Sequence, residues 1–251
     1  MVQVELRGKV ALVTGAAQRV GRVIALELAK EGVNLLVHYN RAEPAQVRDT
    51  LGEIKSHGVD AHAVQADLSG AEGVDTLMVA AAERFDRLDI VVNSASVFQA
   101  RDFLEVSLAD WDLTMAVNLR APFLITQRAT RIMADNPIGG GVIVNISDSG
   151  VDGPWKKYPH HGISKHALWM LTQVSALSLA PEIRVNAIVP GPVLKPAGRG
   201  TTDEQWAQVG RRSVLQKTGE PEDVARAVVY LCQEDHISGA LLHVNAGEHL
   251  R

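Results

Sequence analysis

Cysteine, long apolar runs and repeated segments are scarce in this sequence, and each absence excludes a class of protein. The chain of 251 residues holds one cysteine, Cys232, which excludes an internal disulfide and disfavours a cysteine-based metal site. Such thiol usage fits a reducing compartment, so we expect a cytoplasmic protein with Cys232 buried in a helix. The N-terminal residues contain no long apolar segment, which argues against a signal peptide and a membrane span.

An excess of positive charge is also missing. The chain carries 25 Lys and Arg against 29 Asp and Glu, for a net charge of -4. That balance predicts neither a nucleic-acid partner nor an anionic membrane surface, and leaves a small molecule as the expected partner. No linker or low-complexity stretch divides the chain, and 46% of its residues are hydrophobic. We therefore read residues 1–251 as a single domain.

Short β-branched runs alternate with longer segments of helical periodicity. Strands are predicted at 9–15, 33–39, 61–68, 88–95, 140–147, 183–191 and 239–247. Helices are predicted at 22–32, 43–57, 71–86, 107–135 (as one or two), through Lys165 to Leu179, and at 221–234. Strands that are apolar throughout are typical of a parallel sheet covered on both faces. The fold class is therefore α/β: a doubly wound, Rossmann-type parallel sheet in three layers, α/β/α.

A glycine-containing turn, VTGAAQRVGRVIA (13–25), joins the first strand to the first helix. Gly15 and Gly21 are placed to let backbone N–H groups approach a pyrophosphate at a helix N-terminus. The dinucleotide fingerprint has a further glycine two residues before Gly21, where this chain has Arg19. Arg19 is either a solvated loop cation or a guanidinium lying across phosphates or another anion. Since the turn has no other reason to be basic, we favour the second interpretation.

The second strand ends in VHYNRAE (37–43), without the acidic residue that usually contacts a ribose 2′-hydroxyl. His38, Tyr39, Asn40 and Arg41 occupy this stretch. Arg41, helped by His38, would suit a 2′-phosphate, which predicts NADP(H) over NAD(H). The alternative is that Arg41 is an ordinary surface arginine.

Asp67, in the ADL triplet after the third strand, has two interpretations. Its carboxylate could accept a hydrogen bond from an adenine amino group, or it could be the N-cap of the next helix.

These segments resemble the short-chain dehydrogenase/reductase family, in order and over essentially the whole chain. The turn at 14–21 and the ADL triplet resemble the family's nucleotide contacts. NSAS (93–96) resembles its NNAG element, and PGPV (190–193) its nicotinamide loop. Asn118 falls at the position of the catalytic asparagine. The resemblance and the turn together predict a cofactor site made of Gly15, Arg19, Val20, Gly21, His38, Tyr39, Asn40, Arg41, Asp67, Leu68, Asn93, Ser94, Ala95, Ser96, Lys165, Pro190, Gly191 and Val193.

Within that family the sequence is most similar to pteridine reductases. They share the arginine at Arg19, the LVHYNR segment, the serine at Ser96 and the aspartate at Asp148, where other members have a catalytic serine. They also share Phe98, which stacks on the pterin ring in that group. The likeness implies an NADPH-dependent reductase of a small carbonyl or pterin-like substrate, built as a homotetramer or, second, a dimer on the helices at 107–135 and 160–180. From the residues alone, Phe98 could equally be a core residue, and Trp155 could cover substrate or simply pack.

The family's proton donor is the tyrosine of a YxxxK motif, but the fourth residue before Lys165 is His161. Tyr158 lies seven residues before Lys165, an axial distance of roughly 10.5 Å on a helix against about 6 Å for four residues. Pro159 also disfavours helical backbone at Tyr158, which should precede the helix. Tyr158 therefore does not restore the motif.

Three interpretations of the altered motif remain. A working reductase could use His161 as acid/base with Asp148 orienting it and Lys165 on the nicotinamide ribose. The proton could instead come from Asp148 or water, with His161 only a binding residue. The chain could also be a nucleotide-binding or regulatory member that has lost catalysis. We thus predict Asn118, Asp148, His161 and Lys165 as catalytic residues, and Arg19, Phe98, Asp148 and His161 as substrate contacts. We expect His160 at the surface or an interface, and no metal site, since neighbours on a helix do not share a face.

Overall fold

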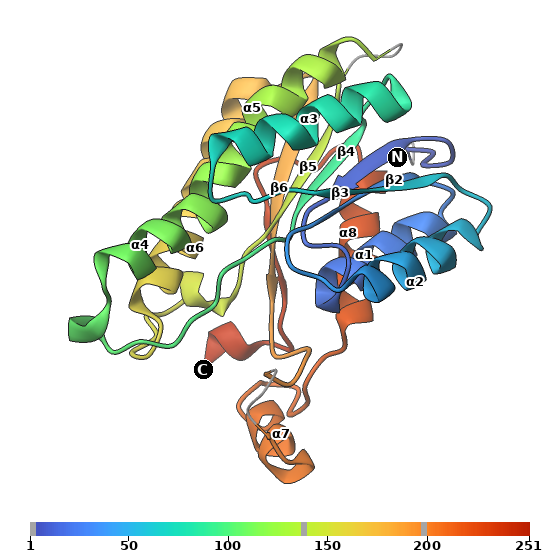
Figure 1. The fold of residues 1–251 in the computed structure, drawn as a ribbon. Coiled ribbons are helices and arrows are strands. Elements are labelled where there is room, and N and C mark those ends of the chain that lie inside the picture. Colours follow the sequence, from blue (N-terminus) through green and yellow to red (C-terminus); the bar gives the residue numbers. More distant parts are fainter. Residues whose placement is uncertain (1–3, 137–139, 197–199) are drawn as a thin grey trace.

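A parallel sheet of seven strands runs through the centre of the part of the chain that the structure describes (Figure 1). The structure, a computed structural model, describes residues 4–136, 140–196 and 200–251. The strands are β1 (Val10–Val13), β2 (Asn34–Tyr39), β3 (Ala61–Gln65), β4 (Ile90–Asn93), β5 (Gly141–Ile146), β6 (Ile183–Pro190) and β7 (Leu241–Val244). Their spatial order is β3-β2-β1-β4-β5-β6-β7. The direction in which successive strands are added to the sheet reverses between β1 and β4. Doubly wound sheets bind ligands at such a point, beyond the carboxyl ends of the strands.

Helices cover both faces of this sheet (Figure 1). They are α1 (Arg19–Lys30), α2 (Pro44–Lys55), α3 (Ala71–Phe85), α4 (Leu108–Met115), α5 (Ala121–Ala134), α6 (Pro159–Leu179), α7 (Asp203–Gly210) and α8 (Pro221–Gln233). Residues of α1 and α8 form one core with the sheet, and residues of α3 and α5 form the other. The predicted three-layer, doubly wound fold is confirmed.

Strand β1 shows why the strands are apolar at every position. Ala11 and Val13 pack in the core beneath α1 and α8, whereas Val10 and Leu12 pack in the core beneath α3 and α5. Successive side chains of a strand point to opposite faces, and here both faces are covered. Leu12 is wholly buried, and burial of a leucine side chain contributes about 1.5–3 kcal/mol to folding.

The helical segment predicted over 107–135 is interrupted in the middle. Ser107 caps α4 by accepting a hydrogen bond from the Asp110 N–H. A π-helical segment, Ala116–Arg120, then separates α4 from α5. Such π-bulges are rare and occur frequently at functional sites. This one carries Asn118, which is completely buried.

Helix α6 begins directly after Tyr158, which is its N-cap and has non-helical backbone angles. The prediction that Tyr158 precedes the helix is confirmed. The prediction for His160 is wrong, because this side chain is only 1% exposed. His160 and His161 lie on different faces of α6. Because α4 packs against α6, a side chain on another face than His161 can still be buried.

Helix α7 was not predicted. The segment DEQWAQVG has a weak apolar pattern, but it starts at a capping box in which Thr202 accepts from the Gln205 N–H. A Ser or Thr followed three residues later by Glu or Gln is the signal that would have found it.

Cys232 lies buried in α8, as expected, and burial raises the pKa of its thiol to about 12. Within the described residues, no helix is long and apolar enough to cross a membrane.

Candidate active site

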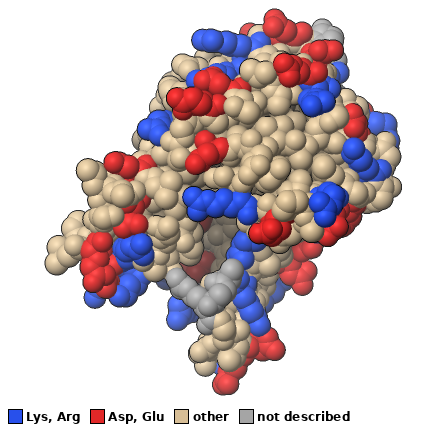
Figure 2. Space-filling view, viewed as in Figure 1, with Lys and Arg blue, Asp and Glu red and all other residues tan. Residues whose placement is uncertain are grey.

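A pocket of about 960 Å³ opens at the carboxyl ends of the strands. Figure 2 shows it as a hollow with Lys and Arg side chains at its edge. Most predicted site residues line it together: Gly15, Arg19, Val20, Gly21, His38, Tyr39, Asn40, Arg41, Asp67, Leu68, Ser94, Ala95, Ser96, Phe98, Asp148, His161, Lys165, Pro190 and Gly191. The parallel strands bring these segments to one edge of the sheet because all of them end on the same side.

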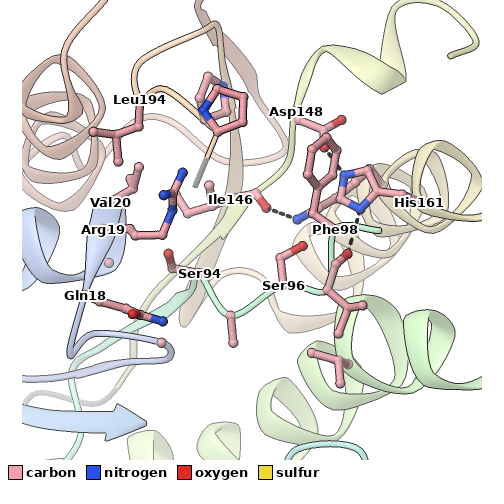
Figure 3. A pocket seen from close by; sticks show the side chains of 18 of the residues that line it. Gln18, Arg19, Val20, Ser94, Ser96, Phe98, Ile146, Asp148, His161 and Leu194 are labelled. Atoms are coloured by element: carbon pink, nitrogen blue, oxygen red, sulfur yellow. Dashed lines mark hydrogen bonds and ion pairs between the residues drawn. The ribbon is translucent and has the colours of Figure 1, made fainter. Parts of the chain in front are cut away.

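The turn between β1 and α1 has the close backbone approach expected of a phosphate-binding loop. A Cβ atom on Gly21 would lie 2.4 Å from the Gly15 carbonyl oxygen, so only glycine fits there. Gly15 itself has a φ of 68°. Arg19 adopts a φ of 53°, in the left-handed region that L-residues disfavour. Arg19 thus keeps the backbone that a glycine would adopt more easily, and Figure 3 shows its side chain on the side of the pocket opposite Asp148 and His161.

His38 lies beneath this turn with both ring nitrogens occupied. Its Nδ1 accepts from the Gly15 N–H at 3.0 Å, and its Nε2 lies 3.1 Å from the Ala66 carbonyl oxygen. The ring is therefore a neutral imidazole that donates at Nε2. Burial lowers the pKa of His38, outweighing the hydrogen bond to Ala66 and the charge of Asp67. His38 fixes the loop, and Arg41 is left as the cation at the end of β2.

Asp67 does not cap the next helix. The N-cap of α3 is Gly70, whereas Asp67 Oδ1 accepts from the Ser69 N–H at 2.9 Å. The hydrogen bonds from Ser69 hold the pKa of Asp67 below its ordinary value, with a smaller contribution from Arg41. Asp67 is therefore an ionised acceptor at the pocket wall.

Two predicted cofactor residues lie outside the pocket wall. Asn93 is buried, and its Nδ2 donates to Asn145 Oδ1 at 2.8 Å, joining β4 to β5. Val193 packs against the apolar core, and its neighbours Pro192 and Leu194 line the pocket instead.

Thr14 organises the segment after β4, a role that the sequence reading missed. Its Oγ1 accepts from the N–H groups of Ser94 and Ala95, both at 2.9 Å. A polar residue at the end of an otherwise apolar strand was the available signal.

Asn118 joins three segments of the site. Its Oδ1 accepts from the Val97 N–H at 2.8 Å and from Ser96 Oγ at 3.2 Å. Its Nδ2 donates to Ser164 Oγ at 3.0 Å and to the Val97 carbonyl at 3.1 Å. The same nitrogen lies 3.2 Å from His161 Nδ1. Because an amide nitrogen carries two hydrogens, the two shorter contacts use both.

His161 is held between two acceptors. Its Nε2 bonds to Asp148 Oδ2, and its Nδ1 lies 2.9 Å from the Val97 carbonyl oxygen. Neither partner can donate while Asp148 is ionised, so satisfying both acceptors takes a hydrogen on each ring nitrogen. Burial alone would raise the pKa of Asp148, but the hydrogen bond and charge of His161, with Lys165 and the Gly150 N–H, hold it below its ordinary value.

Depth in the pocket distinguishes the two partners. The side chain of His161 is 2% exposed and that of Asp148 is 18% exposed. Figure 3 shows the pair joined at one end of the pocket, with Phe98 beside it. The carboxylate is thus the more accessible end of the pair.

Lys165 is a buried residue of the pocket wall, on the same helix as His161. It is 4% exposed, and its Nζ donates to the Ile146 carbonyl at 2.7 Å. Burial lowers the pKa of Lys165, and the charge of Asp148 opposes that shift.

Aromatic side chains form one wall. Phe98 is 50% exposed and lines the pocket, so it is not a core residue. Its ring stacks on Tyr158 with centroids 4.3 Å apart, and it meets His161 edge to face at 4.7 Å. Trp155 lines the same wall. This wall offers a flat apolar surface next to Asp148.

Further wall residues were missed because they come from regions that the sequence reading did not assign to the site. Gln205, Trp206 and Val209 of α7 and Glu248 near the C-terminus line the pocket.

The chain matches known proteins over almost its whole length. A family model described as enoyl-(acyl carrier protein) reductase matches residues 15–249. Glucose 1-dehydrogenase 2 of Bacillus subtilis (strain 168) is 35% identical over 249 residues, covering 97% of this chain and 95% of that protein.

Two solved structures share both the fold and the extent of the chain. FolM alternative dihydrofolate reductase 1 from Brucella canis, complexed with NADP, has a TM-score of 0.90 and 32% identity, covering 98% of this chain and 96% of that chain. A blue fluorescent protein from a metagenomic library, in complex with NADPH, has a TM-score of 0.89 and 30% identity, covering 98% and 99%.

Proposed function

The chain belongs to the short-chain dehydrogenase/reductase family, and we propose that it is an NADPH-dependent reductase of a small carbonyl compound or a pterin-like heterocycle. The observation that carries this proposal is the Asp148–His161 hydrogen bond at the pocket wall, beside Asn118 and Lys165. A carboxylate hydrogen-bonded to a buried imidazole at a pocket wall is an arrangement suited to proton transfer.

The pocket fits a dinucleotide phosphate. The Gly15–Gly21 contact packs the turn tightly against the start of α1 at the pocket wall, where backbone N–H groups would suit a pyrophosphate, with Arg19 beside it. Arg41 is the cation at the end of β2, where an acidic residue would repel a 2′-phosphate. The relatives solved with NADP and NADPH support the same cofactor. When bound, the nicotinamide supplies a hydride to the substrate.

We assign the substrate proton to the Asp148–His161 pair, with Asp148 as the group that faces the substrate. As negative charge develops on the reduced substrate atom, the His161 Nε2–H bond breaks and its proton passes to Asp148, which transfers it to that atom. His161 becomes neutral and keeps its Nδ1 hydrogen on the Val97 carbonyl. Solvent returns the proton through the partly exposed carboxylate.

The aromatic wall supports a flat substrate. Phe98, half exposed, and Trp155 offer apolar surface next to Asp148, and aromatic rings prefer offset or edge contacts with other rings. Together with Arg19, Phe98 and Asp148 carry the particular likeness to pteridine reductases.

We also propose a cytoplasmic homo-oligomer, a tetramer first and a dimer second. Large apolar side chains are exposed along α5 and α6, among them Phe123, Met170, Val174 and Leu177. Exposed apolar patches of this kind mark association surfaces. Light scattering during size-exclusion chromatography tests the number of subunits.

The decisive experiment has two steps. Purified protein is titrated with NADPH and with NADH, and NADPH oxidation is then followed over a panel of dihydropterins, quinones and ketones. We expect tighter NADPH binding and turnover of at least one compound class. Tighter NADH binding would contradict the cofactor assignment. NADPH binding without turnover of any compound would instead identify a non-catalytic member of the family.

A further inference from the structure

The last turn of the chain brings a second carboxylate to the pocket wall. Glu248 lines the same pocket as Asp148 and begins a short 3-10 helix, Glu248–Leu250. Two residues with positive φ precede it, Ala246 at 54° and Gly247 at 76°. Alanine disfavours that backbone region, so surrounding contacts must hold the turn in place.

Buried Asn245 supplies part of that support. Its Oδ1 accepts from the Gly247 N–H at 3.2 Å, and the Ala246 carbonyl accepts from the Leu215 N–H at 3.1 Å. Asn245 also packs against Gly191 of the pocket wall, where an added Cβ would lie 2.7 Å from the Asn245 Cα. The turn is therefore fixed relative to the pocket.

Contacts with the segment after β5 add further support. His243 Nε2 lies 2.9 Å from Asp152 Oδ1, and the His243 ring stacks on His249 with centroids 4.0 Å apart. Ser149, which directly follows Asp148, lies close enough to the Glu248 carboxylate to lower its pKa. Glu248 is thereby held next to the end of the pocket that contains Asp148.

The Glu248 carboxylate is incompletely satisfied. Among the described residues its Oε2 is buried and has no hydrogen-bond partner. Burial raises the pKa of Glu248, although Ser149 and the charge of Arg212 act in the opposite direction. A buried acceptor without a donor is destabilising, and such a group calls for an explanation. The terminal carboxylate torsion is soft, so either oxygen can turn towards a donor in the pocket.

We propose that Glu248 is a specificity residue that accepts a hydrogen bond from an amino group or ring N–H of the substrate. The substrate class is a flat, nitrogen-containing ring that stacks on the Phe98 wall, meets Asp148 at its reacting atom and presents an N–H edge to Glu248. This inference rests on the proposed function in one respect: it takes this pocket to be the substrate site.

The test compares two flat rings that differ by one amino group, 2-aminoquinazoline and quinazoline. Their affinities are measured by calorimetry on the full chain, with and without saturating NADP. In the wild type we expect 2-aminoquinazoline to bind about tenfold to a hundredfold more tightly, as for one hydrogen bond to a charged acceptor. Glu248→Leu should remove that preference, and Glu248→Gln should reduce it. Glu222→Gln, an equal charge change on exposed surface of α8, should leave it intact.

Thermal unfolding separates specificity from folding. Because burial raises the pKa of Glu248, the charged carboxylate destabilises the protein above its unfolded pKa. At pH 7, Glu248→Gln should therefore unfold at a higher temperature than the wild type. The same variant should show a reduced preference for 2-aminoquinazoline over quinazoline. If Glu248→Leu does not fold, the glutamine variant decides. Failure of the wild type to bind 2-aminoquinazoline, or an equal preference in wild type and Glu248→Gln, would overturn the assignment. An absence of NADPH turnover would overturn the proposed function while leaving this binding result in place.

Discussion

The imidazole of His161 lies behind the carboxylate of Asp148, with side-chain exposures of 2% and 18%. Since the Val97 carbonyl accepts from the far side of the ring, the imidazole cannot turn towards the pocket without breaking that contact. This arrangement is the basis of our proposal that Asp148 contacts the substrate and that His161 supplies its proton.

Asp148→Asn should therefore abolish turnover at least as completely as His161→Phe. An amide cannot pass a proton on, and loss of general acid catalysis costs about 10²–10⁴-fold in rate. Both variants should bind NADPH nearly as the wild type does. Steady-state reduction and NADPH titration are the measurements. The chain offers a matched control in the surface pair of His62, on β3, and Asp60, which precedes that strand; His62→Phe should change neither quantity. Full turnover by Asp148→Asn would assign the proton to His161 or water.

The same pair should make stability depend on acid pH. The folded-state pKa of Asp148 is lowered, so the stabilisation by this pair is present above the unfolded pKa and is lost as pH falls through the folded value. In His161→Phe, the largely buried Asp148 loses its hydrogen-bonded partner, a loss worth about 3 kcal/mol in comparable cases. The difference in unfolding free energy between wild type and variant should be largest near neutrality and shrink below about pH 4. Urea denaturation over a pH series measures it. A pH-independent difference would show that packing, not charge, makes up the loss.

Much of the site could be predicted because it depends on local patterns. The apolar strands fix which segments meet at the sheet edge, and the glycines at 15 and 21 mark the turn that approaches most closely. The spacing of His161 and Lys165 along one helix is likewise a property of the sequence. These features needed no knowledge of how distant segments pack.

Depth and distance account for the features that were missed. His38 turns inwards because Gly15 and Ala66, from two other segments, supply its hydrogen bonds. His160 is buried on a helix that the sequence predicts, but the sequence does not show which elements pack around that helix. Glu248 comes to the same pocket as Asp148 only through a strained turn whose supports come from several loops. Periodicity carries no information about such contacts.

Arg41 should set the preference between the two nicotinamide cofactors. Because His38 is neutral and buried, Arg41 is the cation left at the end of β2 for a 2′-phosphate. Arg41→Ala should weaken NADPH binding about tenfold, since the contact is charged but exposed, and leave NADH binding unchanged. Fluorescence titration with both cofactors measures the ratio. Arg48→Ala, on the exposed face of α2, is the control for a lost positive charge. Equal losses for both cofactors would place Arg41 on a phosphate that they share.

Arg19→Gly should change stability and cofactor binding in opposite directions. A left-handed backbone costs an L-residue about 1–2 kcal/mol, and the added freedom of glycine in the unfolded chain costs about 0.5–1 kcal/mol. The variant should therefore gain roughly 0.5–1 kcal/mol in unfolding free energy. It should also bind NADPH more weakly, because the guanidinium beside the phosphate site is removed. Gln216 has the same backbone, with a φ of 55°, on an exposed loop, so Gln216→Gly should gain similar stability with unchanged NADPH binding. An Arg19→Gly variant that gains stability and binds NADPH as before would show that Arg19 is only a solvated cation.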